Sequence, residues 1–173
     1  MSDAVETAAP AYESFCGLLR ARGPTLNLLF EQARMASERE GDAIMRDAFA
    51  GALIWGLHGM LRQYWQTAGA SKAEWRRAGP LVAGYSVGQI LAAALDNLRH
   101  FEDWDNEKSG ALLQRRSVRV LCAVLALPVK KSAKHPPFRG NVSWAVLGGL
   151  SNGTDYGAIE KLVREFARHL IGT

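Results

Sequence analysis

Apolar residues recur every three or four positions along most of the chain, and this spacing constrains the fold more than any other feature. Stripes of this kind begin at Tyr12, Leu26, Leu53, Ile90 and Ile159. Residues three or four apart share one face of a helix, so each stripe predicts an amphipathic helix with that face buried. No stretch alternates apolar and polar residues for long enough to predict a sheet. The sequence therefore predicts an all-α, single-domain antiparallel bundle of about five main helices plus two short ones.

The length of the chain is consistent with one hydrophobic core, and no linker-like tract divides it. A chain of 173 residues can bury a sufficient core as a single unit. Residues 11–173 are expected to form this helical domain, and residues 1–10 a disordered leader without the features of a secretory signal. The apolar run over 48–61 is too short to span a membrane. Cys16 and Cys122 fit no disulfide or zinc pattern, so a reducing, cytoplasmic location is expected.

Local signals predict where helices begin and end. Gly23-Pro24 is expected to end a first helix, and Asp42 to cap the longest and most central one, which reaches about Thr67. Ser71 and Ser86 each begin a capping-box pattern, and Asn141 is a candidate cap for a short helix. In the long helix, a stripe of small residues predicts close approach of a neighbouring helix: Ala48, Ala52, Gly56 and Gly59.

Positive charge is concentrated in one segment of the sequence. Residues 1–107 contain 10 Lys or Arg and 14 Asp or Glu, whereas residues 108–154 contain 8 Lys or Arg and no Asp or Glu. We call residues 108–154 the basic segment. Its cations are Lys108, Arg115, Arg116, Arg119, Lys130, Lys131, Lys134 and Arg139. A segment whose charged residues all have the same sign gives information about binding partners rather than about the fold.

The basic segment predicts a non-enzymatic binding protein. The residues expected to contact the phosphates of a nucleic acid, RNA first, or the carboxylates of an acidic protein subunit are Arg115, Arg116, Arg119, Lys130, Lys131, Lys134 and Arg139. Such a chain could serve as a small subunit of a nucleoprotein or bacterial defence assembly. An alternative is a homodimeric scaffold, in which the basic segment of one copy meets the acidic residues Glu102, Asp103 and Asp105 of another.

A second cluster of polar residues follows one predicted helix. Asp96, His100 and Asp103 are spaced by four and three residues, so they share a helix face and could bind a divalent metal. The alternative is an exposed helix end on which these side chains pair with their neighbours. His58, in the central helix, is most simply a core or interface histidine.

The last predicted helix carries Arg164 and His169, separated by four residues. This arrangement resembles the Arg-x4-6-His signature of HEPN domains, which are helical bundles of about this size. In that family, Arg and His side chains paired across a dimer interface act on the RNA phosphodiester. The resemblance implies, as an alternative function, a ribonuclease with Arg164 and His169 as catalytic residues. Leu98–Asn106 resembles a second HEPN-like fragment in which Leu98 and Asp103 replace the Arg and the His, which implies a catalytically silent relative.

Motifs of other enzyme classes are missing from the sequence. There is no phosphate loop ending in Gly-Lys-Ser/Thr, no HExxH zinc motif and no GxGxxG dinucleotide motif. No cofactor is therefore expected.

Overall fold

The computed structural model describes residues 3–106, 116–128, 136–151 and 155–170. Helices make up most of these residues, which confirms the predicted all-α class. Four of the helices have 15 or more residues, and three have nine or fewer. The elements in chain order are α1 (Asp3–Ser37), α2 (Ala43–Thr67), α3 (Lys72–Arg77), β1 (Leu81–Val82), β2 (Tyr85–Ser86), α4 (Val87–Asn106), α5 (Arg116–Val124), α6 (Ser143–Ser151) and α7 (Tyr156–Leu170).

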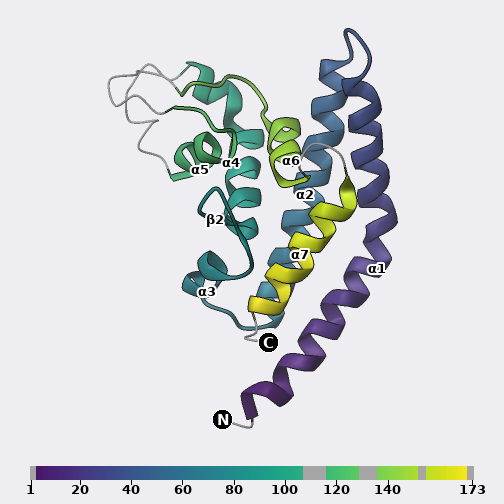
Figure 1. The fold of residues 1–173 in the computed structure, drawn as a ribbon, viewed down its shortest axis with the longest axis vertical. Coiled ribbons are helices and arrows are strands. Elements are labelled where there is room, and N and C mark those ends of the chain that lie inside the picture. Colours follow the sequence, from purple (N-terminus) through teal and green to yellow (C-terminus); the bar gives the residue numbers. More distant parts are fainter. Residues whose placement is uncertain (1–2, 107–115, 129–135, 152–154, 171–173) are drawn as a thin grey trace.

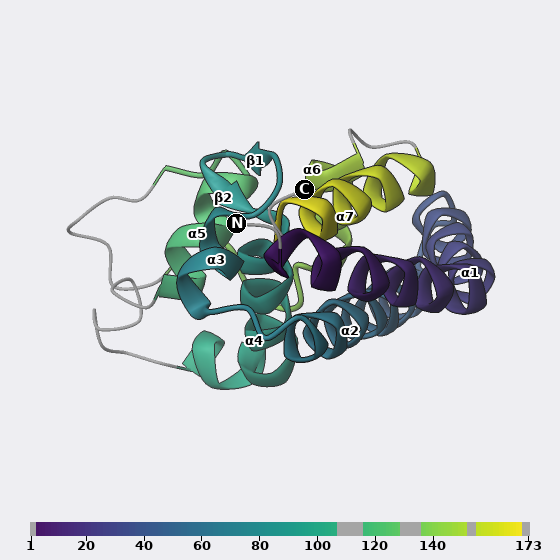
Figure 2. The ribbon, with the colours of Figure 1, turned by 90° about the horizontal axis from the view of Figure 1, so that it is seen from below.

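Helix α2 is the central helix, as its length and apolar content predict. It forms a long antiparallel hairpin with α1 and also contacts α4, α6 and α7 (Figure 1). Seen from below, α3, α4 and α5 gather at one side of the molecule, and the hairpin of α1 and α2 extends away from them (Figure 2). The α2 side chains Leu57, Met60 and Leu61 are fully buried between these neighbours. Among the described helices, none has both the length and the apolar character needed to cross a lipid bilayer.

Helix α1 corrects two predictions about the start of the chain. It begins at Asp3, so residues 3–10 are helical rather than a disordered leader, and it continues through Pro10 and Pro24 without a break. Each proline lacks one backbone N–H and normally weakens a helix interior. Pro24 is exposed, whereas Leu26 and Phe30 just after it are buried in the core. Packing of α1 against α2 therefore offsets the lost hydrogen bond, a tertiary effect that local signals do not contain.

The stripe of small residues in α2 serves helix packing at only some of its positions. A Cβ on Gly56 would lie 2.7 Å from Leu26 Cδ2, so α1 approaches α2 closely there. Ala48, Ala52 and Gly59 are instead exposed, and a Cβ on Gly59 would meet no atom within 4 Å. The prediction of one continuous packing stripe is wrong, and Gly59 faces open space.

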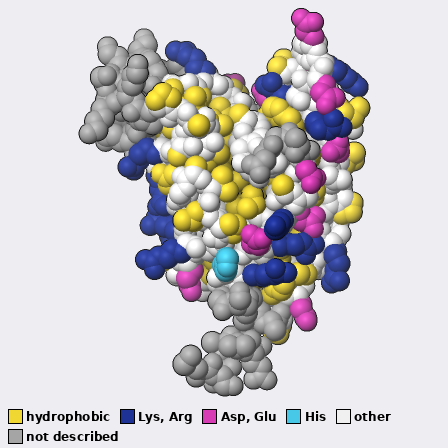
Figure 3. Space-filling view, in the orientation of Figure 1, with side chains coloured by type: hydrophobic (Ala, Val, Ile, Leu, Met, Phe, Trp, Pro, Cys, Tyr) yellow, Lys and Arg dark blue, Asp and Glu magenta, His cyan; other side chains and the backbone are white. Residues whose placement is uncertain are grey.

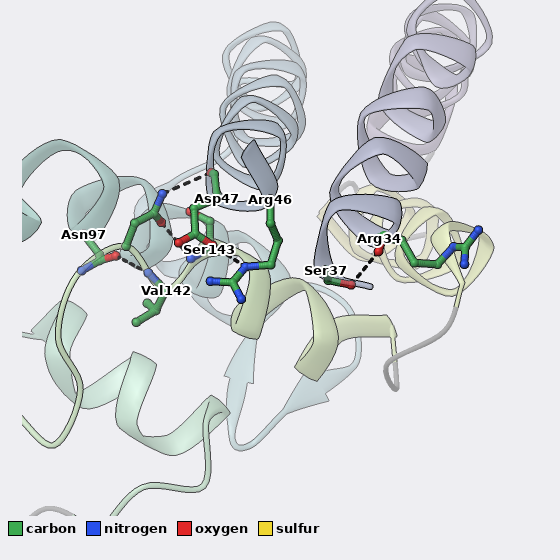
Figure 4. A network of polar contacts seen from close by, with 8 residues as sticks. Arg34, Ser37, Arg46, Asp47, Asn97, Val142 and Ser143 are labelled. Carbon is green, nitrogen blue, oxygen red and sulfur yellow. Dashed lines mark hydrogen bonds and ion pairs between the residues drawn. The ribbon is translucent and has the colours of Figure 1, made fainter. Parts of the chain in front are cut away.

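Asn97 of α4 fixes the loop that leads into α6 (Figure 4). Its side chain is 1% exposed; Nδ2 donates to the Gly140 carbonyl at 3.1 Å, and Oδ1 accepts from the Val142 amide at 3.0 Å. Between these two residues, Asn141 donates to the Asp47 carbonyl at 3.2 Å and accepts from the first amide of α6 at 2.9 Å. The predicted role of Asn141 at the start of this helix is therefore confirmed.

A small antiparallel strand pair connects α3 to α4. Val82 of β1 lies opposite Tyr85 of β2, and the turn residues Ala83 and Gly84 have φ angles of 51° and 82°. A turn with positive φ at both central residues matches the twist of paired strands. Strands of two residues each are too short to show the alternation by which a sheet is predicted, so the sequence gives no indication of them.

The helix-capping predictions have mixed outcomes. Both capping boxes, at Ser71 and Ser86, are present. The Ser86 hydroxyl also donates to the carbonyl of Trp75 at 2.9 Å, which ties the start of α4 to α3. Asp42 occupies the N-cap position of α2 but makes no side-chain capping bond, contrary to the prediction.

Candidate ligand-binding pocket

A pocket of about 630 Å³ opens between α2, α3, α4 and α5. This volume lies within the range of small-molecule sites, which is roughly 300–1,000 Å³. Small apolar side chains, Ala92, Ala93 and Val120, form part of its lining. The rest of the lining is aromatic, cationic or hydrogen-bonding, so the pocket offers different chemistry on different walls.

Four cations line the pocket: Arg62, Lys72, Arg76 and Arg116. All four are exposed, and none forms an ion pair or hydrogen bond with another described residue. Asp96 is the one acidic residue among the lining residues, so positive charge dominates there. Lys and Arg side chains also follow one another along the edge of the molecule that carries α5 and α3 (Figure 3). This arrangement attracts anions.

Two tryptophans form the aromatic wall of the pocket. The ring centroids of Trp65 and Trp75 are 5.4 Å apart, and Trp75 packs edge-on against Phe166 of α7 at 5.0 Å. A Cβ on Gly88 would lie 2.6 Å from Trp75 Cε2, so the ring rests directly on the start of α4. Trp75 is therefore held from two sides, and its position in the wall is well defined.

Several polar groups in the lining can donate to or accept from a ligand. Gln89 uses its side-chain oxygen to accept from the Ser86 amide at 3.2 Å, which leaves its amide N–H groups as donors. Asp96 is half-buried and Ser117 is partly exposed. A planar ligand with both donors and acceptors on its edge fits this set.

His58 contributes a neutral imidazole to the lining. Its burial, and then the charges of Arg62 and Arg99, lower its pKa from the ordinary value. The unfolded chain binds this proton near pH 6.5 and the folded chain only at lower pH. The contribution of His58 to stability is therefore complete above about pH 6.5, and it is lost as the pH falls through the folded-state pKa.

Substitution of Arg62→Gln should raise the pKa of His58, because it removes one of the charges that oppose protonation. An NMR titration of the imidazole measures this change directly. Arg39→Gln, at an exposed position outside the pocket lining, is the control and should leave the titration unchanged. A wild-type His58 that titrates at or above the free-imidazole value would contradict this description of the pocket.

No protein-family model, curated protein or solved structure matches the chain. The function is therefore inferred from the chemistry of the pocket itself.

Three of the seven predicted binding residues lie in the part of the chain that the structure describes. Arg116 lines the pocket, Arg119 is exposed one turn further along α5, and Arg139 is exposed in the loop before α6, outside the pocket lining. Arg115, Lys130, Lys131 and Lys134 lie outside the described residues, as does Lys108. Among described residues, no ion pair engages Arg116, Arg119 or Arg139.

Three of the four pocket cations lie outside the basic segment. Arg62, Lys72 and Arg76 come from the first 107 residues, where acidic residues outnumber basic ones. A count along the sequence therefore conceals them. The spacing between these cations and nearby tryptophans gives a weaker indication of a binding site. Trp65 follows Arg62 by three residues, and Trp75 follows Lys72 by three. Cations interleaved with aromatic residues are typical of surfaces that bind single-stranded nucleic acid.

The other predicted sites are not assembled by the described residues. His100 Nδ1 lies 3.3 Å from Asp103 Oδ2 at an exposed helix end, as the non-metal alternative predicts. Asp96 lines the pocket instead, and no three described His, Cys, Asp or Glu side chains are placed to hold a metal ion. Arg164 pairs with Glu160 at 2.7 Å, while His169 is exposed near the end of α7. The HEPN-type ribonuclease stays a prediction.

Proposed function

We propose that the chain binds single-stranded nucleic acid without acting on it chemically. One base would lie in the pocket against Trp65 and Trp75, and the adjoining phosphates would contact the four pocket cations. The observation that carries this proposal is the placement of four exposed cations, free of carboxylate partners within the described residues, around a cavity walled by two indole rings. Phosphate contacts supply affinity, and base stacking on aromatic rings adds to it without reading sequence.

The lining favours a nucleic acid over an acidic protein segment. Carboxylates would satisfy the cations but leave the indole wall without a planar partner. A base provides a flat face for the wall formed by Trp65 and Trp75, and its edge can pair with Gln89, His58 and Asp96. The pocket is also larger than a phosphate group alone requires.

The basic segment extends the proposed surface. Arg119 is exposed on α5 one turn from Arg116, so it can contact the next phosphate of a bound strand. A cytoplasmic location and a role as a small subunit of a nucleoprotein assembly, defence systems included, belong to the same proposal. Cys16 and Cys122 are both free thiols, which is compatible with a reducing compartment.

Binding to a mixed-sequence RNA of about ten nucleotides tests the proposal, with fluorescence anisotropy as the readout. Four neutralised phosphates should give a slope of about −3 when the logarithm of affinity is plotted against that of salt concentration. The combined variant Arg62→Gln, Arg76→Gln and Arg116→Gln should bind about 30-fold more weakly and lower this slope by about two.

A variant with the same change in net charge provides the control. Arg20→Gln, Arg22→Gln and Arg39→Gln alter exposed cations in or just after α1, away from the pocket. This variant should retain most of the affinity. Equal losses in the two variants, or no binding of RNA by the wild type, would contradict the proposal. Tighter binding of a poly-glutamate peptide than of RNA would identify an acidic protein as the partner instead.

A further inference from the structure

A third tryptophan lies on the surface of α2 outside the pocket. Trp55 is 54% exposed, which is unusual for so large an apolar side chain. The guanidinium carbon of Arg99, on α4, is 4.7 Å from the centroid of its ring. This contact covers one part of the indole and restrains its orientation. Much of the ring stays open to solvent, so it can stack with a further flat group.

Trp55 lies in line with the pocket along the seam between α2 and α4. Trp55, Gly59 and Arg62 are spaced by four and three residues on α2, so they share one helix face. On α4, Arg99 follows the pocket residue Asp96 by one turn. The charges of Arg62 and Arg99 both act on His58, so both cations lie near the same imidazole. The seam is therefore cationic from the pocket to Trp55.

Gly59 leaves the surface between Trp55 and the pocket bare. It is exposed, and a Cβ added there would meet no atom within 4 Å. Packing against another part of the described chain therefore does not explain a glycine in the middle of this helix. Trp55 and Trp65 are ten residues apart on α2, which corresponds to about 15 Å along the helix axis. This is a distance that a few linked nucleotides can span.

We infer that Trp55 and Arg99 form a second base-stacking site, and that a single strand runs from it over Gly59 into the pocket. The inference rests on the proposed function and specifies the path of the ligand. The strand places one base on the open part of the Trp55 ring. Arg99 and Arg62 neutralise the phosphates between the two bases, and the bare backbone at Gly59 lets the strand lie close to α2. The site thus takes an oligonucleotide rather than a mononucleotide alone.

Ligand length separates the two sites experimentally. Trp55→Ala should weaken binding of a uridine oligonucleotide of about six residues roughly tenfold, because it removes one stacking platform. The same variant should bind uridine monophosphate as the wild type does, because a mononucleotide occupies only the pocket. Isothermal titration calorimetry measures both ligands on the same protein.

Gly59→Leu provides an independent test that does not depend on loss of an aromatic ring. Leucine favours a helix more than glycine does, and a Cβ at this exposed position meets no atom within 4 Å, so the variant should melt at a higher temperature than the wild type. It should nevertheless bind the oligonucleotide more weakly, because its side chain obstructs the path, and bind the mononucleotide unchanged. Leu28→Ala removes a comparably exposed apolar side chain from α1 and should change neither ligand.

The outcomes distinguish this inference from the proposed function. Unchanged oligonucleotide binding by Trp55→Ala and Gly59→Leu, together with weak binding by the pocket arginine variant, would overturn the second site and leave the pocket intact. Unchanged binding by all three variants would overturn both proposals. A wild-type dimer in light scattering that Trp55→Ala converts to a monomer would identify this face as a contact between copies, and would also overturn the second site.

Discussion

Gly79→Ala should lower the free energy of unfolding by about 3 kcal/mol. Gly79 has a φ of 75°, where a side chain costs roughly 1–2 kcal/mol. A Cβ there would also lie 2.7 Å from Cα and 3.0 Å from the backbone nitrogen of Phe166. Backbone atoms within α7 cannot move aside as a flexible side chain would, so overpacking adds about 1–3 kcal/mol. Urea denaturation followed by circular dichroism measures the loss.

The matched control for this substitution is Gly69→Ala. Gly69 also has a positive φ, 63°, but a Cβ there would meet no atom within 4 Å. It should show only the conformational cost of about 1 kcal/mol. A loss at Gly79 no greater than that at Gly69 would show that α7 does not pack against this turn as described.

Asn97→Leu should destabilise the fold by about 3 kcal/mol. Leucine has the same side-chain branching and number of heavy atoms as asparagine, but it can neither donate to the Gly140 carbonyl nor accept from the Val142 amide. Asn97 is 1% exposed, so water does not readily replace these bonds. Each hydrogen bond lost by a buried polar group costs about 1–3 kcal/mol. Thermal and urea unfolding measure the change in stability.

An exposed asparagine serves as the control for Asn97. Asn27 lies on the exposed face of α1, and Asn27→Leu should change stability by less than about 0.5 kcal/mol. If both substitutions had the same small effect, the loop before α6 would not depend on Asn97. Hydrogen exchange of the Val142 amide should also become faster in Asn97→Leu, which locates the loss in this loop.

The sequence predicts the parts of the fold that depend on residues close together in the chain. The apolar stripes predict the helical class, and the capping boxes at Ser71 and Ser86 predict two helix starts. The predictions from the sequence that are wrong concern residues whose conformation depends on partners far away in the chain. The continuity of α1 through Pro24 depends on packing against α2, and the exposure of Gly59 depends on which faces of α2 its neighbours cover.

The candidate site was harder to predict for the same reason. Charge along the sequence draws attention to the basic segment, which contributes Arg116 to the pocket lining. Arg62, Lys72 and Arg76 are dispersed among acidic residues in the sequence, whereas the fold gathers them around one cavity whose lining contains a single acidic residue, Asp96. A count along the sequence does not reveal cations that α2, α3 and α5 bring together in space.

Trp75 belongs both to the pocket and to the packing of the C-terminal helix. One side of its ring lines the cavity, and its contact with Phe166 joins α3 to α7. One residue after that contact in sequence, the carbonyl of Ala167 accepts from the Tyr64 hydroxyl of α2 at 2.9 Å, so α7 is also bonded to α2. A molecule that restrains the Trp75 ring therefore also restrains α7. Order in the pocket and order in the last helix are thermodynamically linked, so ligand occupancy and C-terminal fraying oppose each other.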